Sequence, residues 1–221
     1  TAYEMCGRDW SSDVCSSDLD QMPRGFLIGA TSGRTTLAGE GLQHQDGQSQ
    51  VFAATVPNLK SYDPCFAGEL AIIFDEGMRR MMSEGKDEFY YLTVTNEKYS
   101  HPEIDLKNKE GIIKGGYLFE DKTIKGINVN LIGSGTIFRE CIEASEILLK
   151  EFNIGSRLYS ITSYSELERE ARSIKRKNTL DPANKKQSYI EKLFNNDDLI
   201  IATSDYIRAY SQLISTYVKN K

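Results

Sequence analysis

The spacing of apolar residues along the chain predicts alternating strands and helices. Apolar residues recur every four positions within Phe66–Met82, which predicts a helix over Cys65–Ser83. The aromatic and β-branched run Phe89–Thr95 has charged flanks and is predicted as a buried strand. Val51–Val56 is also apolar and β-prone, and it is predicted as a strand. Strand, helix and strand in this order indicate a βαβ unit.

A second alternating series follows in the C-terminal half. The predicted strands are Val129–Ile132, Leu158–Thr162 and Leu199–Thr203. The predicted helices are Thr136–Phe152, Ser165–Arg172 and a last helix capped by Ser204. One face of the helix Thr136–Phe152 carries Ile137, Cys141, Ala144, Leu148 and Phe152. Asn96–Lys125 carries mixed charges and is predicted as a linker, and Lys175–Lys186 is predicted as a basic loop. The fold class is therefore α/β with mostly parallel strands.

Composition narrows the class of protein. The 221 residues are 39% hydrophobic and 27% charged, which fits a soluble globular chain. No apolar run reaches the ~18 residues of a membrane span, so no membrane role is expected. A net charge of -5 argues against binding to nucleic acid. Four cysteines without a CxxC pair favour neither a disulfide framework nor a zinc site, and they fit a reducing cytoplasm.

The first nineteen residues differ from the rest of the chain. Asp9–Leu19 is small, polar and partly repetitive, and it has no helical or strand period. One interpretation is a disordered tail. We favour another, because the string resembles a sequencing-library adapter translated in one frame. Residues 1–19 are therefore left out of the fold prediction, and re-sequencing the source gene checks this interpretation.

Three short features each allow a ligand-binding interpretation. Gly133-Ser134-Gly135 lies between a strand and a helix, as in some nucleotide sites, but Phe138 replaces the third glycine of that motif. A tight structural turn is the favoured interpretation. The basic run Lys175–Lys177 is interpreted as a solvated loop rather than an anion site. Phe89–Tyr91 matches a buried strand better than a base-stacking surface.

The polar, glycine-rich stretch Thr31–Gln50 is the strongest functional candidate. Twenty irregular residues inside a compact chain are usually functional or disordered. The stretch contains Glu40 and His44, together with Arg34 and Asp46. Histidine transfers protons near neutral pH, and neighbouring carboxylates tune its pKa. A solvated surface loop remains the alternative.

Several long motifs in series carry a resemblance. They are RGFLIGATSGRTTLAGEGLQHQDG (Arg24–Gly47), TVPNLKSYDP (Thr55–Pro64), FYYLTVTNEKY (Phe89–Tyr99), LIGSGTIFRE (Leu131–Glu140), YSITSYSEL (Tyr159–Leu167) and ATSDY (Ala202–Tyr206). Over Asp20–Lys221 the chain resembles the homodimeric, thiamine-diphosphate-dependent first component of the pyruvate dehydrogenase complex. The resemblance implies transketolase-like domains: the end of a pyrimidine-binding domain over residues 20–114, and an incomplete C-terminal domain over residues 115–221.

The resemblance also implies a function and a site. The parent enzyme decarboxylates pyruvate on thiamine diphosphate with Mg²⁺, and it reductively acetylates a lipoyl group on the dihydrolipoyl acetyltransferase component. It is a cytoplasmic homodimer. His44 matches the family histidine that faces the cofactor and substrate, and Glu40 in the same motif is a second candidate. No metal ligand is expected here, because the parts that hold the diphosphate and Mg²⁺ match nothing in this chain. The fragment alone is therefore expected to be inactive.

One departure from the family pattern concerns two positions after His44. The family usually has histidine where this chain has Gln48 and Gln50, and glutamine carries no proton at neutral pH.

Two alternatives to the main hypothesis stay open. One is a non-catalytic α/β domain used for packing or partner binding, and the other is a related 2-oxo acid dehydrogenase or a transketolase.

Overall fold

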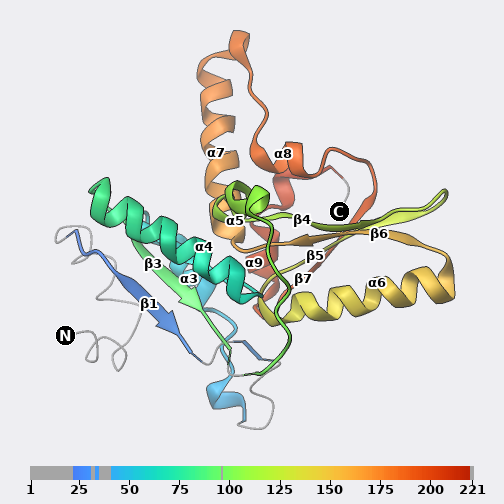
Figure 1. Cartoon of the computed structure of the whole chain (residues 1–221). Coiled ribbons are helices and arrows are strands. Elements are labelled where there is room, and N and C mark those ends of the chain that lie inside the picture. The colour runs from blue at the N-terminus through green and yellow to red at the C-terminus, as the bar shows by residue number, and fades with distance from the viewer. Residues whose placement is uncertain (1–21, 31–32, 35–40, 96, 220–221) are drawn as a thin grey trace.

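The computed structural model describes residues 22–30, 33–34, 41–95 and 97–219, without the side chain of Leu42. Their strands form two sheets, one from each half of the chain (Figure 1). The first sheet has the order β1-β3-β2, and the second has the order β4-β6-β5-β7. All strand pairs are parallel except the pair of β4 with β6. The predicted α/β class with mostly parallel strands is confirmed.

The first sheet is a βαβ unit with one further strand. It contains β1 (Phe26–Gly29), β2 (Leu59–Tyr62) and β3 (Phe89–Thr93), and helix α4 (Ala67–Met78) connects β2 to β3. A π-helical turn, Arg79–Ser83, extends α4 to the predicted last residue. The central strand β3 is buried throughout, as its aromatic sequence predicts.

The second sheet carries the C-terminal half. Its strands are β4 (Tyr117–Lys122), β5 (Asn128–Gly133), β6 (Gly155–Ser160) and β7 (Leu199–Thr203), and its helices are α6 (Phe138–Phe152), α7 (Tyr164–Leu180), α8 (Tyr189–Leu193) and α9 (Arg208–Gln212). The predicted strand Leu199–Thr203 matches β7 at both ends.

One predicted strand is a helix. Val51–Val56 lies in α3 (Ser49–Thr55) and its C-cap, so that prediction was wrong. The Asp46 carboxylate accepts hydrogen bonds from the backbone amides of Gln48 and Ser49, at 3.0 Å each, and thereby starts the helix. The tertiary contacts of Gln50 and Ala53, which are both fully buried, override the β propensity of the sequence.

The predicted linker Asn96–Lys125 was wrong in part. Its residues include helix α5 (Lys109–Lys114) and the edge strand β4. The antiparallel pairing of β4 with β6 is a long-range contact, and the charged sequence of β4 does not reveal it. Similarly, Lys175–Leu180 of the predicted basic loop are the last residues of α7.

Two helix details also differ from the prediction. The buried face of α6 contains Phe138, Cys141 and Ser145, whereas Phe152 of the predicted face is 62% exposed. Ser204 does not cap the last helix. Its hydroxyl accepts a hydrogen bond from the Tyr206 amide, and α9 begins four residues after Ser204.

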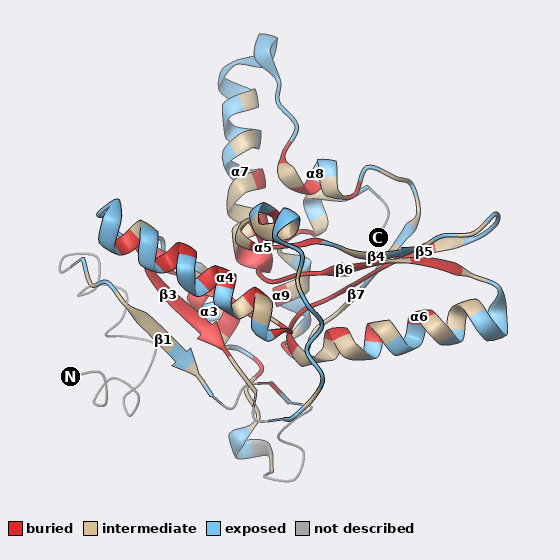
Figure 2. Cartoon of the chain, in the orientation of Figure 1, coloured by how far each residue is buried: buried red, intermediate tan, exposed pale blue. Residues whose placement is uncertain are grey.

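Helices pack on both sheets, and burial is concentrated in the strands β3, β5 and β6 (Figure 2). In β3, Tyr90 and Leu92 pack under α4, while Phe89 and Tyr91 face α3. In β6, Leu158 packs toward α6 and Tyr159 toward the cluster of α7, α8 and α9. Burial on both faces is typical of parallel strands.

Candidate functional site

The carboxyl ends of strands from both sheets meet around Asp63, which directly follows β2. Its backbone carbonyl accepts a hydrogen bond from the Gly135 amide at 2.8 Å, and its amide donates to the Thr162 carbonyl at 2.7 Å. Gly135 follows β5 and Thr162 follows β6. Ligands of parallel α/β sheets bind outside the carboxyl ends of the strands, so this is the expected place for a site.

The Asp63 carboxyl group is nearly enclosed by polar groups. Thr93 donates its hydroxyl to Oδ1 at 2.6 Å, and Ser134 donates to Oδ2 at 2.9 Å. Burial is the main cause that raises the pKa of Asp63 to about 7, with contributions from the carboxylates of Asp205 and Asp46, while the two hydrogen bonds oppose the shift. Asp63 therefore gains or loses its proton near neutral pH.

A small cavity of about 10 Å³ lies beside this carboxyl group, with room for one water molecule. Gly33 of the glycine-rich stretch Thr31–Gln50 lines the cavity. The other lining residues lie at or just after the ends of strands: Asp63, Pro64, Thr93, Val94, Thr95, Gly135, Thr136, Asp205 and Tyr206. Tyr206 is 5% exposed, and its buried hydroxyl has no hydrogen-bond partner among the described residues. The cavity is polar but too small for an organic substrate.

The structure places His44 outside this cavity, on the surface. It ends a 3₁₀ turn, Leu42–His44, and its amide donates to the Gly41 carbonyl at 3.2 Å. The His44 side chain is exposed. Gly41, at the start of the turn, has φ +90°, a conformation that favours glycine. Glu40, the second predicted site residue, lies outside the described residues.

The two glutamines that follow His44 have different environments. Gln48 is exposed, and its side-chain oxygen accepts a hydrogen bond from the Gly47 amide at 3.3 Å. Gln50 is fully buried in the first turn of α3. Its side-chain amide bonds the Tyr62 carbonyl, the Thr93 hydroxyl and the Tyr210 hydroxyl. Gln50 is therefore a structural contact between the two halves of the chain.

The Gly133-Ser134-Gly135 turn is structural, as interpreted from the sequence. The Gly135 amide is already bonded to Asp63, and a side chain at Gly135 would lie 2.6–2.9 Å from the Asp63 carboxyl atoms. The position where a phosphate would approach is thus filled by a carboxyl group, which would repel it.

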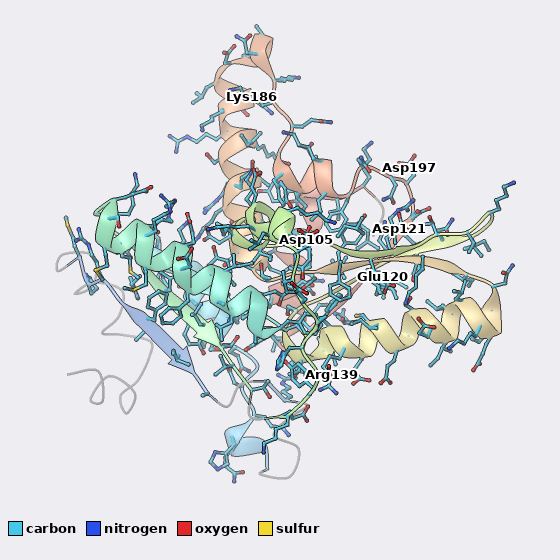
Figure 3. All side chains as sticks on the ribbon, in the orientation of Figure 1. Asp105, Glu120, Asp121, Arg139, Lys186 and Asp197 are labelled. Atoms are coloured by element: carbon cyan, nitrogen blue, oxygen red, sulfur yellow. The ribbon has the colours of Figure 1, made fainter. Side chains whose placement is uncertain are left out.

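The basic run Lys175–Lys177 lies on α7, away from the junction of the sheets. Figure 3 shows Lys186 on the segment that returns along α7, where its amide donates to Asn178. Both basic groups are mostly exposed, which agrees with a solvated charged surface. Phe89–Tyr91 are buried in β3, so they offer no face for stacking a base.

Possible metal ligands are dispersed over the described residues. Within these ranges, no three His, Cys, Asp or Glu side chains gather closely enough to hold a metal ion. Cys65 and Cys141 are unpaired and buried, and burial raises the pKa of both thiols, which disfavours metal-binding thiolates. No helix in the described part of the chain is long and apolar enough to cross a membrane.

Comparison with protein families assigns both halves. The pyruvate dehydrogenase E1 component middle domain matches residues 1–102, and the transketolase-like C-terminal domain matches residues 115–221. Pyruvate dehydrogenase E1 components from Pseudomonas aeruginosa and Escherichia coli K12 are 46% and 44% identical, over 99% and 98% of this chain. The chain belongs to the pyruvate dehydrogenase E1 component family. It spans about a quarter of the length of these relatives (25% and 24%).

Solved structures show the fold of this E1 segment. Transketolase from Campylobacter jejuni superposes with a TM-score of 0.57 at 15% identity, covering 88% of this chain and 26% of the transketolase chain. Transketolase from Leishmania mexicana gives a TM-score of 0.55 at 14% identity, covering 78% and 22%. The predicted transketolase-like fold is confirmed, and so is the family resemblance.

Most of the residues that meet at the strand ends were not predicted from the sequence. Thr93 lies near the end of the predicted strand Phe89–Thr95, and Ser134 follows the predicted strand Val129–Ile132 after one glycine, which is a readable signal. Asp63 stands in a Tyr-Asp-Pro sequence, which is typical of a turn and gives no sign of a site. The strand before it, β2, was not predicted because Lys60 and Ser61 interrupt its apolar sequence.

Proposed function

We propose that the whole protein containing this segment decarboxylates pyruvate on thiamine diphosphate and reductively acetylates a lipoyl group. The observation that carries the proposal is the 40–46% identity to pyruvate dehydrogenase E1 components along nearly the whole chain. The likeness to transketolases, at 14–15% identity, supports the fold alone. A transketolase activity therefore has less support.

In this proposal the chain contributes His44 to a site completed by other parts of the protein. Thiamine diphosphate supplies the carbanion chemistry when it is bound. His44 donates or accepts a proton at its imidazole, and its exposure at the end of a short turn leaves the ring accessible. Glu40 is proposed as a second polar group beside the substrate. Mg²⁺ and the diphosphate are assigned to other parts of the protein, because the described residues do not form a metal site.

The test of this role is His44→Ala in the full-length protein. Loss of a general acid–base group lowers kcat by about 100-fold or more, while folding is retained because the side chain is exposed. The measurement is pyruvate-dependent and thiamine-dependent reduction of an electron acceptor, with circular dichroism as the check on folding.

The matched control is the chain's other histidine, His101. It lies against Phe66 and Tyr99, and its Nδ1 accepts a hydrogen bond from the Ala67 amide. His101→Ala is expected to keep kcat within about twofold. If His44→Ala retains full activity, His44 is not in the site. If the full-length wild type shows no pyruvate-dependent turnover, the proposed function itself is wrong.

We propose a homodimer that assembles with the dihydrolipoyl acetyltransferase component in the cytoplasm. Support for an interface comes from large apolar side chains left exposed on the first sheet and on the π-helical turn after α4, with Ile28 at 53% and Met82 at 56%. The unpaired Cys65 and Cys141 fit a reducing compartment. The alternative is a non-catalytic packing domain. Thiamine diphosphate titration by calorimetry of the full-length protein distinguishes the two, because only the enzyme binds it.

We also propose that the chain divides into a pyrimidine-binding domain over residues 20–114 and a C-terminal domain from residue 115. Gly115 ends α5 with φ 109°, immediately before the chain enters β4 of the second sheet. Residues 1–19 keep their interpretation as an artefact or a tail, and they lie outside the described residues.

A further inference from the structure

We propose that Tyr210 of the C-terminal half is a positioning residue for the His44 segment, acting through Gln50. This inference rests on the proposed function and gives the second sheet a part in it. The geometry is a continuous path from α9 to the first turn of α3, six residues after His44.

Both the nitrogen and the oxygen of the Gln50 side-chain amide have hydrogen-bond partners. Its Nε2 donates to the Tyr62 carbonyl and to Thr93 Oγ1, both at 3.1 Å, and its Oε1 accepts from the Tyr210 hydroxyl at 3.3 Å. Gln50 and Tyr210 are both fully buried. Without the Tyr210 hydroxyl, Oε1 of Gln50 would stay buried and lose its partner. The amide would still bear the cost of its desolvation, so this rotamer of Gln50 depends on Tyr210.

A second contact joins the same two elements closer to His44. The Ile207 amide, just before α9, donates to the Gly47 carbonyl at 2.9 Å. Gly47 is buried, and the Arg34 guanidinium lies where a side chain at this position would begin. The start of α9 therefore holds the backbone three residues after His44.

Gln48 and Ser49, which lie between Gly47 and Gln50, form a cap with Asp46 at the start of α3. Asp46 accepts hydrogen bonds from the amides of Gln48 and Ser49 and from the Ser49 hydroxyl. The Tyr91 hydroxyl donates to the same serine at 3.0 Å. A cap held at both ends transmits a shift of α9 to the turn that carries His44, and small displacements of a reacting group cost catalytic rate.

The test compares Tyr210→Phe with Tyr164→Phe in the full-length protein. The two rings lie edge to face, with centroids 5.0 Å apart, and both are fully buried. The Tyr164 hydroxyl has no hydrogen-bond partner in the part of the chain that the structure describes, so its removal is the matched control. Tyr210→Phe is expected to lower kcat about fivefold to tenfold with KM for pyruvate within about twofold, while Tyr164→Phe changes neither.

The double variant with His44→Ala separates positioning from general stability. If Tyr210 acts through His44, its removal in the His44→Ala background lowers the residual kcat by less than about twofold. A purely structural role lowers kcat by the same factor in both backgrounds, and that result overturns the inference. An inactive wild type refutes the proposed function instead, so the two failures are distinguishable.

Hydrogen exchange gives a readout that needs no turnover. Tyr210→Phe is expected to speed exchange of the backbone amides of residues 47–53 about tenfold in the cofactor-free protein, with no change in β6. Equal exchange in Tyr210→Phe and Tyr164→Phe would falsify the positioning role.

Discussion

Asp63 is a carboxyl group whose proton is linked to folding. Its two oxygens accept hydrogen bonds from Thr93 and Ser134, and no salt bridge reaches it within the described residues. Burial, followed by the charges of Asp205 and Asp46, raises its pKa to about 7, far above the ~3.9 of an unfolded aspartate. The folded state therefore binds an extra proton between pH ~4 and ~7.

The stability contributed by this proton is fully present below pH ~4 and is lost as pH rises through about 7. We expect Asp63→Asn to remove this dependence. The free energy of unfolding of the wild type, minus that of the variant, should fall by up to about 1.4 kcal/mol per pH unit across this window. Urea unfolding of the chain at pH 4, 5, 6, 7 and 8 measures it. A difference that rises with pH would mean that Asp63 is ionised in the fold.

At the scale of elements, Glu69 fixes the start of α4 to the second sheet. The side chain is fully buried, and its carboxylate accepts from the amides of Cys65 and Phe66 at 2.8 and 2.9 Å. Tyr117 of β4 and Ser160 of β6 donate hydroxyls to the other oxygen, at 3.0 and 2.5 Å. One residue thus caps a helix and joins it to two strands of the other sheet.

Glu69→Ala leaves these four donors without a partner and opens a cavity. We expect a loss of about 3–5 kcal/mol in the free energy of unfolding. Glu69→Gln keeps a hydrogen-bonding group in the same space and should lose less than half of that. Chemical denaturation measures both, with the exposed Glu110→Ala on α5 as the control. Similar losses for alanine and glutamine would show that the site requires the charge rather than the hydrogen bonds.

The elements also show what sequence pattern can and cannot predict. Segments with strong periodicity and a buried face, such as β3, β7 and α4, were predicted because local spacing reports their burial. Helix α3 was predicted as a strand, since its cap at Asp46 depends on a turn that spacing does not reveal. Strand β4 depends on pairing with β6, about forty residues later. At the site, motif resemblance indicated His44, whereas Asp63 required the spatial arrangement of strand ends.

At the scale of the whole molecule, Arg169 of helix α7 joins the second half of the chain to the first sheet. Its guanidinium donates to the carbonyls of Ala54, Val56 and Leu59 at 3.2, 2.6 and 2.5 Å, where α3 ends and β2 begins. The neighbouring Glu166 accepts from Lys60 of β2 at 2.5 Å. A single arginine therefore satisfies three backbone carbonyls of the other half of the chain.

Arg169→Met keeps the apolar stem and removes all three donors. We expect a loss of about 2–4 kcal/mol, because three carbonyls lose their partner at a partly buried interface. The loss should fall mainly on the first sheet: amides of Phe89–Thr93 exchange faster, while those of β6 keep most of their protection. Arg172→Met, one turn further along α7 and paired with Glu168, is the control and should leave both sheets unchanged. Equal acceleration in the two sheets would instead mean that they unfold as one cooperative unit, with Arg169 stabilising the whole rather than joining two parts.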